Sequence, residues 1–161
     1  MEENGTSQQI YGNKIMKIEI NEIEVNKIKS HGEKTFPEEC CGVLIGSNNK
    51  YPVVEEVRPM RNINVGTKER RYNIDPMDLV KVDKEVEEVG LELLGIYHSH
   101  PNHPSRPSKF DLEHAWPNFS YMVLSVNEGK SDLITSWRLE PDRKKFLQEK
   151  IEILNENYTE N

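Results

Sequence analysis

Two histidines and an aspartate stand at a spacing that suits a metal site. His98 and His100 are two residues apart, and Asp111 follows the second histidine after a loop that three prolines stiffen. Imidazole nitrogens and carboxylate oxygens are ligands that zinc accepts, and catalytic zinc sites use three protein ligands and an open position. This pattern favours a hydrolytic metalloenzyme.

The segment before the histidines is expected to position them. Residues 91–97 are short, mostly apolar and preceded by Gly90, which predicts a buried strand. Alternate residues of a strand point to the same side, so His98 and His100 should aim at one point where the strand ends. A His-x-His pair alone would be an ordinary surface feature. The added aspartate, serine and proline-rich loop favour a metal.

Ser108 and Asp111 also have a purely structural interpretation. A serine N-cap with an acid three residues later is close to a capping box, and Leu112 and Trp116 could supply the buried face of the helix that follows. We expect both roles to hold, because the helix dipole favours an ionised carboxylate in the first turn.

A hydrolytic metal site also needs a group that moves a proton. Glu38 and Glu39 stand just before a second apolar strand, predicted at residues 41–45. A glutamate at the mouth of a neighbouring strand can take the proton of a metal-bound water and pass it to the leaving amine.

Together, Glu-x-x-Gly before a strand, His-Ser-His-Pro and Ser-x-x-Asp resemble the JAMM (MPN-plus) metalloprotease family over roughly residues 17–140. The resemblance implies that Glu39, rather than Glu38, is the general acid/base and that Ser108 steadies the tetrahedral intermediate. The ligands that it implies for one catalytic Zn²⁺ ion are His98, His100 and Asp111. Every motif position is filled, unlike in the family's inactive MPN-minus members.

The resemblance further implies hydrolysis of a peptide or isopeptide bond after the C-terminal Gly-Gly tail of a ubiquitin-like protein. Small prokaryote-type members act on sulfur carrier proteins, and the compact chain is similar to these in residues 116–126 and 136–139. Two alternatives stay open. One is a zinc amidohydrolase of a small amide, and the other is a metal-stabilised domain that only docks a ubiquitin-like partner.

Composition narrows the class of protein. The 161 residues carry a net charge of −7, which argues against binding to nucleic acid or to a membrane surface. No apolar run is long enough to span a bilayer and no signal-peptide pattern stands at the N-terminus, so a cytoplasmic location is expected. A homodimer is left open.

Other reactive residues are given ordinary interpretations first. The adjacent Cys40 and Cys41 are expected to be reduced and buried, because disulfide geometry disfavours a bridge between neighbours. His103 is interpreted as an exposed loop residue. His114, one helical turn after Asp111, is either a helix-surface residue or a partner of a metal ligand.

Hydrophobic periodicity and helix-capping residues predict the remaining strands and helices. Strands are predicted at residues 17–20, 51–57, 121–126 and 133–139, and helices at 21–32 and from Asp75-Pro76 to Gly90. Pro141 is expected to start a last helix whose apolar face comprises Phe146, Leu147, Ile151 and Leu154.

These elements predict a single α/β domain at residues 16–161, preceded by a disordered extension at 1–15. The expected architecture is a mixed β-sheet flanked by helices. The family resemblance implies the same JAMM/MPN-like (cytidine-deaminase-like) sandwich.

Overall fold

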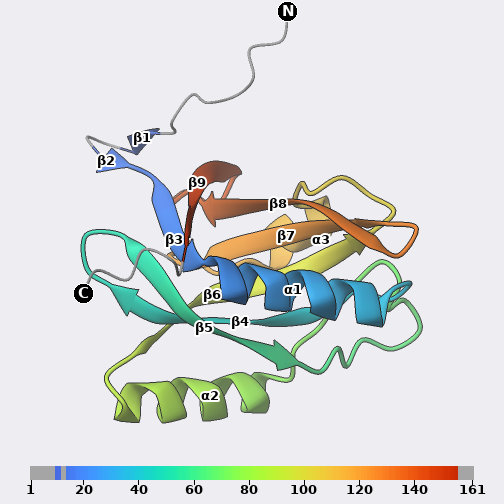
Figure 1. Ribbon diagram of the computed structural model, residues 1–161, viewed down its shortest axis with the longest axis horizontal. Coiled ribbons are helices and arrows are strands. Elements are labelled where there is room, and N and C mark those ends of the chain that lie inside the picture. The colour runs from blue at the N-terminus through green and yellow to red at the C-terminus, as the bar shows by residue number, and fades with distance from the viewer. Residues whose placement is uncertain (1–9, 12–13, 156–161) are drawn as a thin grey trace, which may run out of the picture.

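The structure, a computed structural model, describes residues 10–11 and 14–155 (Figure 1). Its elements in chain order are β1 (Ile10–Tyr11), β2 (Lys14–Ile15), β3 (Lys17–Asn21), α1 (Glu22–Thr35), β4 (Cys41–Asn48), β5 (Pro52–Met60), α2 (Pro76–Glu88), β6 (Glu92–Pro101), α3 (Lys109–His114), β7 (Ser120–Asn127), β8 (Lys130–Leu139) and β9 (Phe146–Leu154). The central feature is a closed barrel with the strand order β3-β5-β4-β6-β7-β8-β9.

The barrel closes because strands from the two ends of the domain pair with each other. β3 runs parallel to β9 and also pairs with β5. The predicted mixed sheet flanked by helices is therefore wrong. The sheet curls until its two edge strands meet, and the described residues contain only three helices.

The error has a local origin in the predicted C-terminal helix, which is the strand β9. Apolar residues at near-helical spacing led to the helix prediction, but residues 150–153 alternate charged and apolar side chains with a period of two. In the structure Ile151 lies opposite Ile18 of β3, and Gln148 lies opposite Trp137 of β8. With β9 taken as a helix, no strand was left to close the barrel.

The predicted starts of α1 and α2 are confirmed, and capping explains them. The Asn21 side chain accepts a hydrogen bond from the backbone of Ile23, and α1 continues to Thr35, beyond its predicted end. The Asp75 side chain caps α2 in the same way, with Pro76 in its first turn. Gly90 follows α2 with φ +78°, a left-handed conformation in which glycine is not strained.

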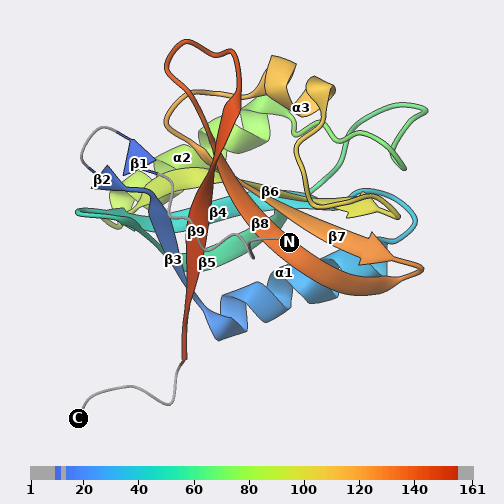
Figure 2. The ribbon, with the colours of Figure 1, turned by 90° about the horizontal axis from the view of Figure 1, so that it is seen from above.

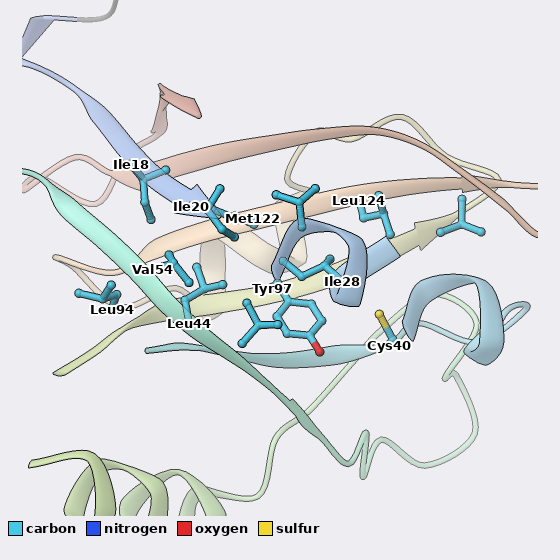
Figure 3. Close-up of a cluster of buried hydrophobic side chains, with 13 residues drawn as sticks. Ile18, Ile20, Ile28, Cys40, Leu44, Val54, Leu94, Tyr97, Met122 and Leu124 are labelled. Atoms are coloured by element: carbon cyan, nitrogen blue, oxygen red, sulfur yellow. The ribbon is translucent and has the colours of Figure 1, made fainter. Parts of the chain in front are cut away.

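The two sides of the barrel wall carry different packing. Figure 2 shows α1 on one side of the strands and α2 with α3 on the other. The α1 residue Ile28 lies in a cluster with Tyr97, Leu44 and Met122 (Figure 3). On the other side, α2 buries two valines against Val43 and its neighbours in a smaller cluster. Alternate residues of β4 thus serve opposite sides, as the pleat of a strand requires.

The N-terminal extension is described only in part. The predicted disorder of residues 1–15 falls mainly on 1–9 and 12–13, which lie outside the described residues. Ile10–Tyr11 pairs antiparallel with Lys14–Ile15. In the described part of the chain, none of the helices has the length and apolar character needed to cross a membrane.

Candidate metal centre

His98, His100 and Asp111 converge on one point, as their spacing predicts. The two Nε2 atoms are 3.1 Å apart, and they lie 3.2 Å and 3.3 Å from the same aspartate oxygen, Oδ2. Tetrahedral zinc ligands at about 2.0–2.1 Å from the ion are about 3.3–3.4 Å from one another. The three donor atoms therefore form one face of a tetrahedron that fits a metal ion of this size.

The register of the barrel explains why the two histidines share a side and what stands beside them. Cys41 of β4 is the antiparallel partner of His98. Continuing this register by two residues brings Glu39 opposite His100, on the same side of the wall. The two histidines of β6 and Glu39, two residues before β4, therefore come together on one side of the barrel wall.

The second nitrogen of each histidine has a distinct environment. Nδ1 of His100 lies 2.8 Å from the Pro104 carbonyl oxygen. Because a carbonyl only accepts, Nδ1 carries the hydrogen and Nε2 is left with its lone pair, the state that a metal ligand needs. Tyr72 stacks on the His98 ring with 4.5 Å between ring centroids. Nδ1 of His98 has no hydrogen-bond partner among the described residues.

Ser108 and Asp111 form the predicted capping box. The Ser108 hydroxyl oxygen accepts from the Asp111 N–H at 3.0 Å, and Asp111 Oδ2 accepts from the Ser108 N–H at 2.8 Å. The same Oδ2 faces both histidines, so the cap and the metal centre share one oxygen. Leu112 is half-buried, as a helix face would have it, but Trp116 is 65% exposed, so its predicted burial is wrong.

In the metal centre, Asp111 and His98 shift each other's pKa values. Burial alone would raise the pKa of Asp111, but the positive charge of His98 and hydrogen bonds from both histidines and Ser108 hold it far below its usual range. Burial opposes the charged form of His98, yet Asp111 and Glu39 raise its pKa. The carboxylate thus stays ionised and attracts positive charge to this point, which is a proton or a metal cation.

Glu39 is buried, with 4% of its surface exposed. Burial raises the pKa of its carboxyl to about 7, while the charges of His98 and His100 act in the opposite direction. Its backbone is clamped by the segment after β5. The Glu39 N–H donates to the Lys68 carbonyl at 2.7 Å, and its own carbonyl accepts from the Asn62 side chain at 3.1 Å.

The other histidines lie outside the cluster of potential metal ligands. His103 is exposed, as predicted, and its carbonyl accepts from the Ser125 hydroxyl. The His114 ring stacks on Phe110 and its Nδ1 lies 2.9 Å from the Phe110 carbonyl, so His114 is a helix-surface residue rather than a partner of Asp111.

The two cysteines are free and buried, as predicted. Burial raises the pKa of the Cys40 thiol to about 11 and that of Cys41 to about 12. Thiols held in their neutral form are poor nucleophiles and poor metal ligands, so both belong to the packing of the strand.

Sequence reasoning missed several residues that shape the centre. Tyr72 and Asn62 come from an irregular segment where no periodicity or capping pattern indicates a role. The contact made by Pro104 is a backbone carbonyl, which no residue type reveals. Only the tertiary arrangement brings these groups to the histidines and Glu39.

Comparison with known proteins locates the chain in a family. Residues 23–140 match the family described as prokaryotic homologs of the JAB domain. The matched stretch covers most of the chain and contains all the groups of the metal centre.

Three relatives of stated activity are similar in sequence. The chain is 34% identical over 90 residues to a desampylase of Haloferax volcanii, covering 55% of this chain and 63%, less than two thirds, of the relative. It is 31% identical over 110 residues to a probable TtuB-protein conjugate cleaving protease of Thermus thermophilus, covering 68% and 71%. It is 29% identical over 119 residues to a CysO-cysteine peptidase of Mycobacterium tuberculosis, covering 71% and 77%.

Solved structures show the same architecture. The solution structure of protein DSY2949 from Desulfitobacterium hafniense superposes with a TM-score of 0.75 at 26% identity, over 89% of this chain and 99% of that one. A protein from Salinibacter ruber superposes with a TM-score of 0.67 at 35% identity, over 84% and 91%. The fold is therefore shared along nearly the whole length of both.

Proposed function

The chain belongs to the prokaryotic homologues of the JAB domain, and on that premise we propose that it is a zinc-dependent metallopeptidase. Its substrate is a ubiquitin-like or sulfur carrier protein. The bond that it hydrolyses is a peptide or isopeptide bond after the carrier's C-terminal Gly-Gly. Relatives named as a peptidase and as a conjugate cleaving protease support this assignment.

The observation that carries the proposal is a three-ligand centre with a buried, unligated acid beside it. His98, His100 and Asp111 present their donor atoms to one another, and Glu39 stands on the same side of the barrel wall. A structural zinc site closes with four protein ligands, whereas a catalytic site keeps a position open. The donor set therefore favours catalysis over a docking domain with a structural ion.

Zinc suits the two imidazoles and one carboxylate, and when bound it supplies a Lewis acid and lowers the pKa of water toward about 7. The protein's own residues do the rest. Glu39 accepts a proton from the attacking water and returns it to the departing nitrogen. The Ser108 hydroxyl oxygen already accepts from the Asp111 N–H, so its O–H hydrogen remains to be donated to the oxyanion that develops on the scissile carbonyl.

Burial of Glu39 helps it act in both directions. A carboxyl whose pKa is raised to about 7 takes up a proton near neutral pH more readily than an exposed glutamate does. A cation in the centre lowers this pKa again, which keeps the carboxylate ready as a base.

The test is cleavage of a sulfur carrier protein that carries an extension after its Gly-Gly. Wild-type protein, Glu39→Gln and a chelator-treated sample are compared, with the zinc content of each measured. Glu38→Gln is the matched control, because it removes a neighbouring carboxylate that is only half-buried.

We expect cleavage by the wild type and by Glu38→Gln only, with zinc retained in Glu39→Gln. A Glu39→Gln variant that still turns over would contradict the role of this residue. Bound zinc without cleavage of any carrier tail would redirect the search to small amides, the substrates of the alternative amidohydrolase. The expected cytoplasmic location is a separate prediction, to be checked by fractionation. The oligomeric state, with a homodimer left open, is to be measured by light scattering.

A further inference from the structure

A hollow lies beside the metal centre, and three of the residues that line it are positively charged. It measures about 400 Å³ and is lined by Thr67, Arg70, Arg71, Ser108, Lys109 and Phe110. Three of these six residues are positively charged and none is acidic, in a chain whose net charge is −7. The local excess of positive charge is therefore opposite in sign to the protein as a whole.

The cations of the hollow are not neutralised by any acidic side chain that the structure describes. Among the described residues, neither arginine nor Lys109 forms an ion pair. Arg61, only nine residues before Arg70, is instead paired with Asp78 at 3.1 Å. All three cations of the hollow are exposed to solvent, so their charge is available to a ligand.

The hollow is also held in shape. The N–H groups of Arg70 and Arg71 both donate to the Thr67 carbonyl, at 3.0 Å and 2.9 Å. The Arg71 guanidinium lies over the Phe110 ring, 4.4 Å from its centroid. A cation–π contact restricts an arginine side chain without neutralising it, so one guanidinium is positioned in advance.

The hollow and the metal centre share walls. Ser108 lines the hollow, and its N–H binds the Asp111 oxygen that faces both histidines. Tyr72, the residue after Arg71, stacks on His98. Ser108 and the Arg71–Tyr72 segment thus connect the hollow with the metal centre.

We propose that this hollow binds a carboxylate of the substrate close to the scissile bond, with Arg71 as the main contact and Arg70 and Lys109 as supports. A guanidinium fork matches a carboxylate in two parallel hydrogen bonds. The inference rests on the proposed peptidase function and narrows its substrate class. Two sources of the carboxylate exist: the terminal carboxylate of a single released amino acid, or an acidic side chain just before the Gly-Gly.

The experiment uses the zinc-loaded protein and two matched pairs of carrier substrates. The first pair ends in Gly-Gly-Ala with either a free carboxylate or a carboxamide. The second pair carries either Glu or Gln immediately before the Gly-Gly. Both members of this pair have the same uncharged extension after the Gly-Gly. The measured quantity is the ratio of kcat/KM within each pair, for wild type, Arg71→Gln, Arg71→Lys and the triple variant Arg70→Gln/Arg71→Gln/Lys109→Gln. Thermal melts and zinc content establish that each variant is folded and loaded.

We expect the wild type to prefer the carboxylate-bearing member of one pair by about tenfold or more, the range of a hydrogen bond to a charged group. The preference should vanish in the triple variant, fall in Arg71→Gln and be partly kept by Arg71→Lys. Arg61→Gln, which removes a cation already paired with Asp78, should leave it unchanged.

Two results would overturn the inference while leaving the peptidase standing: equal cleavage within both pairs, or a preference that survives in the triple variant. Absence of cleavage of all four substrates by the wild type would instead contradict the proposed function. A preference in the first pair identifies release of a single amino acid. A preference in the second pair identifies an acidic carrier tail.

Discussion

The two faces of strand β6 are equally buried but have different roles. One face packs in the core, and the other carries the candidate metal centre. Tyr97 and Ser99 face the cluster under α1, and His98 and His100 face the metal centre. All four have 8% or less of their surface exposed. Burial therefore does not separate scaffold from site.

What separates the faces is how their polar groups are satisfied. On the α1 side, the Ser99 hydroxyl accepts from the Cys40 N–H at 2.8 Å, and the Tyr97 hydroxyl lies 2.7 Å from His31 Nδ1. Both of these hydroxyls have a partner within the protein. On the other side, two imidazole nitrogens and a carboxylate oxygen face one another, an arrangement of acceptors that only a proton or a cation satisfies.

The largest expected effect comes from Asp111→Ala, which changes only the side of β6 that carries the metal centre. The variant loses one ligand and the oxygen that caps α3, so we expect zinc affinity to fall by at least about 100-fold and cleavage to disappear. Zinc content after dialysis and carrier cleavage measure this. Asp132→Ala, an exposed acid on the β7–β8 hairpin, is the control. Stoichiometric zinc in Asp111→Ala would show that the aspartate is not a ligand.

A pair of serine variants tests the comparison most directly. Ser108→Ala removes an oxyanion donor and should lower kcat by about 10²–10³. Ser99→Ala leaves the buried Cys40 N–H without its partner and should lower the free energy of unfolding by about 1–3 kcal/mol with little change in kcat. Urea unfolding and initial rates separate the two. If Ser99→Ala slowed turnover as much as Ser108→Ala, the two faces would not be independent.

The pH dependence of the metal-free protein probes Glu39. Its folded-state pKa, about 7, lies above the unfolded value near 4.5, so the fold binds the proton more tightly than the unfolded chain does. Its stabilising contribution is complete below pH 4.5 and is lost as the pH rises to about 7. Glu39→Gln should remove this decline.

The measurement is the free energy of unfolding of chelated wild type and Glu39→Gln at several pH values. The difference between the two proteins isolates Glu39 from other titrating groups. An identical pH dependence for both would mean that burial does not perturb this carboxyl. With zinc bound, the decline should shift to lower pH or vanish, because the cation stabilises the carboxylate.

The smallest expected effect is that of Tyr97→Phe, a change confined to the α1 side. The lost hydroxyl leaves the half-buried His31 ring to water, which should lower the free energy of unfolding by about 1 kcal/mol. Zinc content and kcat/KM should stay at wild-type values. A clear loss of zinc would show that packing on this side controls the histidines across the strand.

Local rules predicted the geometry around the candidate donors well. The pleat of a strand placed His98 and His100 on one side, and the serine–aspartate spacing predicted the capping box that the structure contains. Capping by Asp75 and Pro76 likewise predicted the start of α2. Each of these depends on residues two to four apart, whose geometry the backbone itself imposes.

Longer-range features were mistaken or missed. The prediction of a last helix was wrong because the apolar residues of the short segment 146–154 are compatible with both the helical and the strand period. Pairing with β3 and β8 made this segment a strand. The clamp of Glu39 by Asn62 and the stack of Tyr72 on His98 come from an irregular segment without a pattern to read.

The sequence by itself determined which groups can do chemistry here and how neighbouring ones are oriented: two imidazoles on one side of a strand, and a carboxylate in the first turn of a capped helix. Only the tertiary structure decided that the barrel closes, that Glu39 is buried beside the histidines, and that Arg70 and Arg71 flank them without an ion pair to any described residue. The reason is physical. Strand pleat and helix caps act between near neighbours in the chain, whereas closure, burial and charge are set by contacts between segments far apart in it.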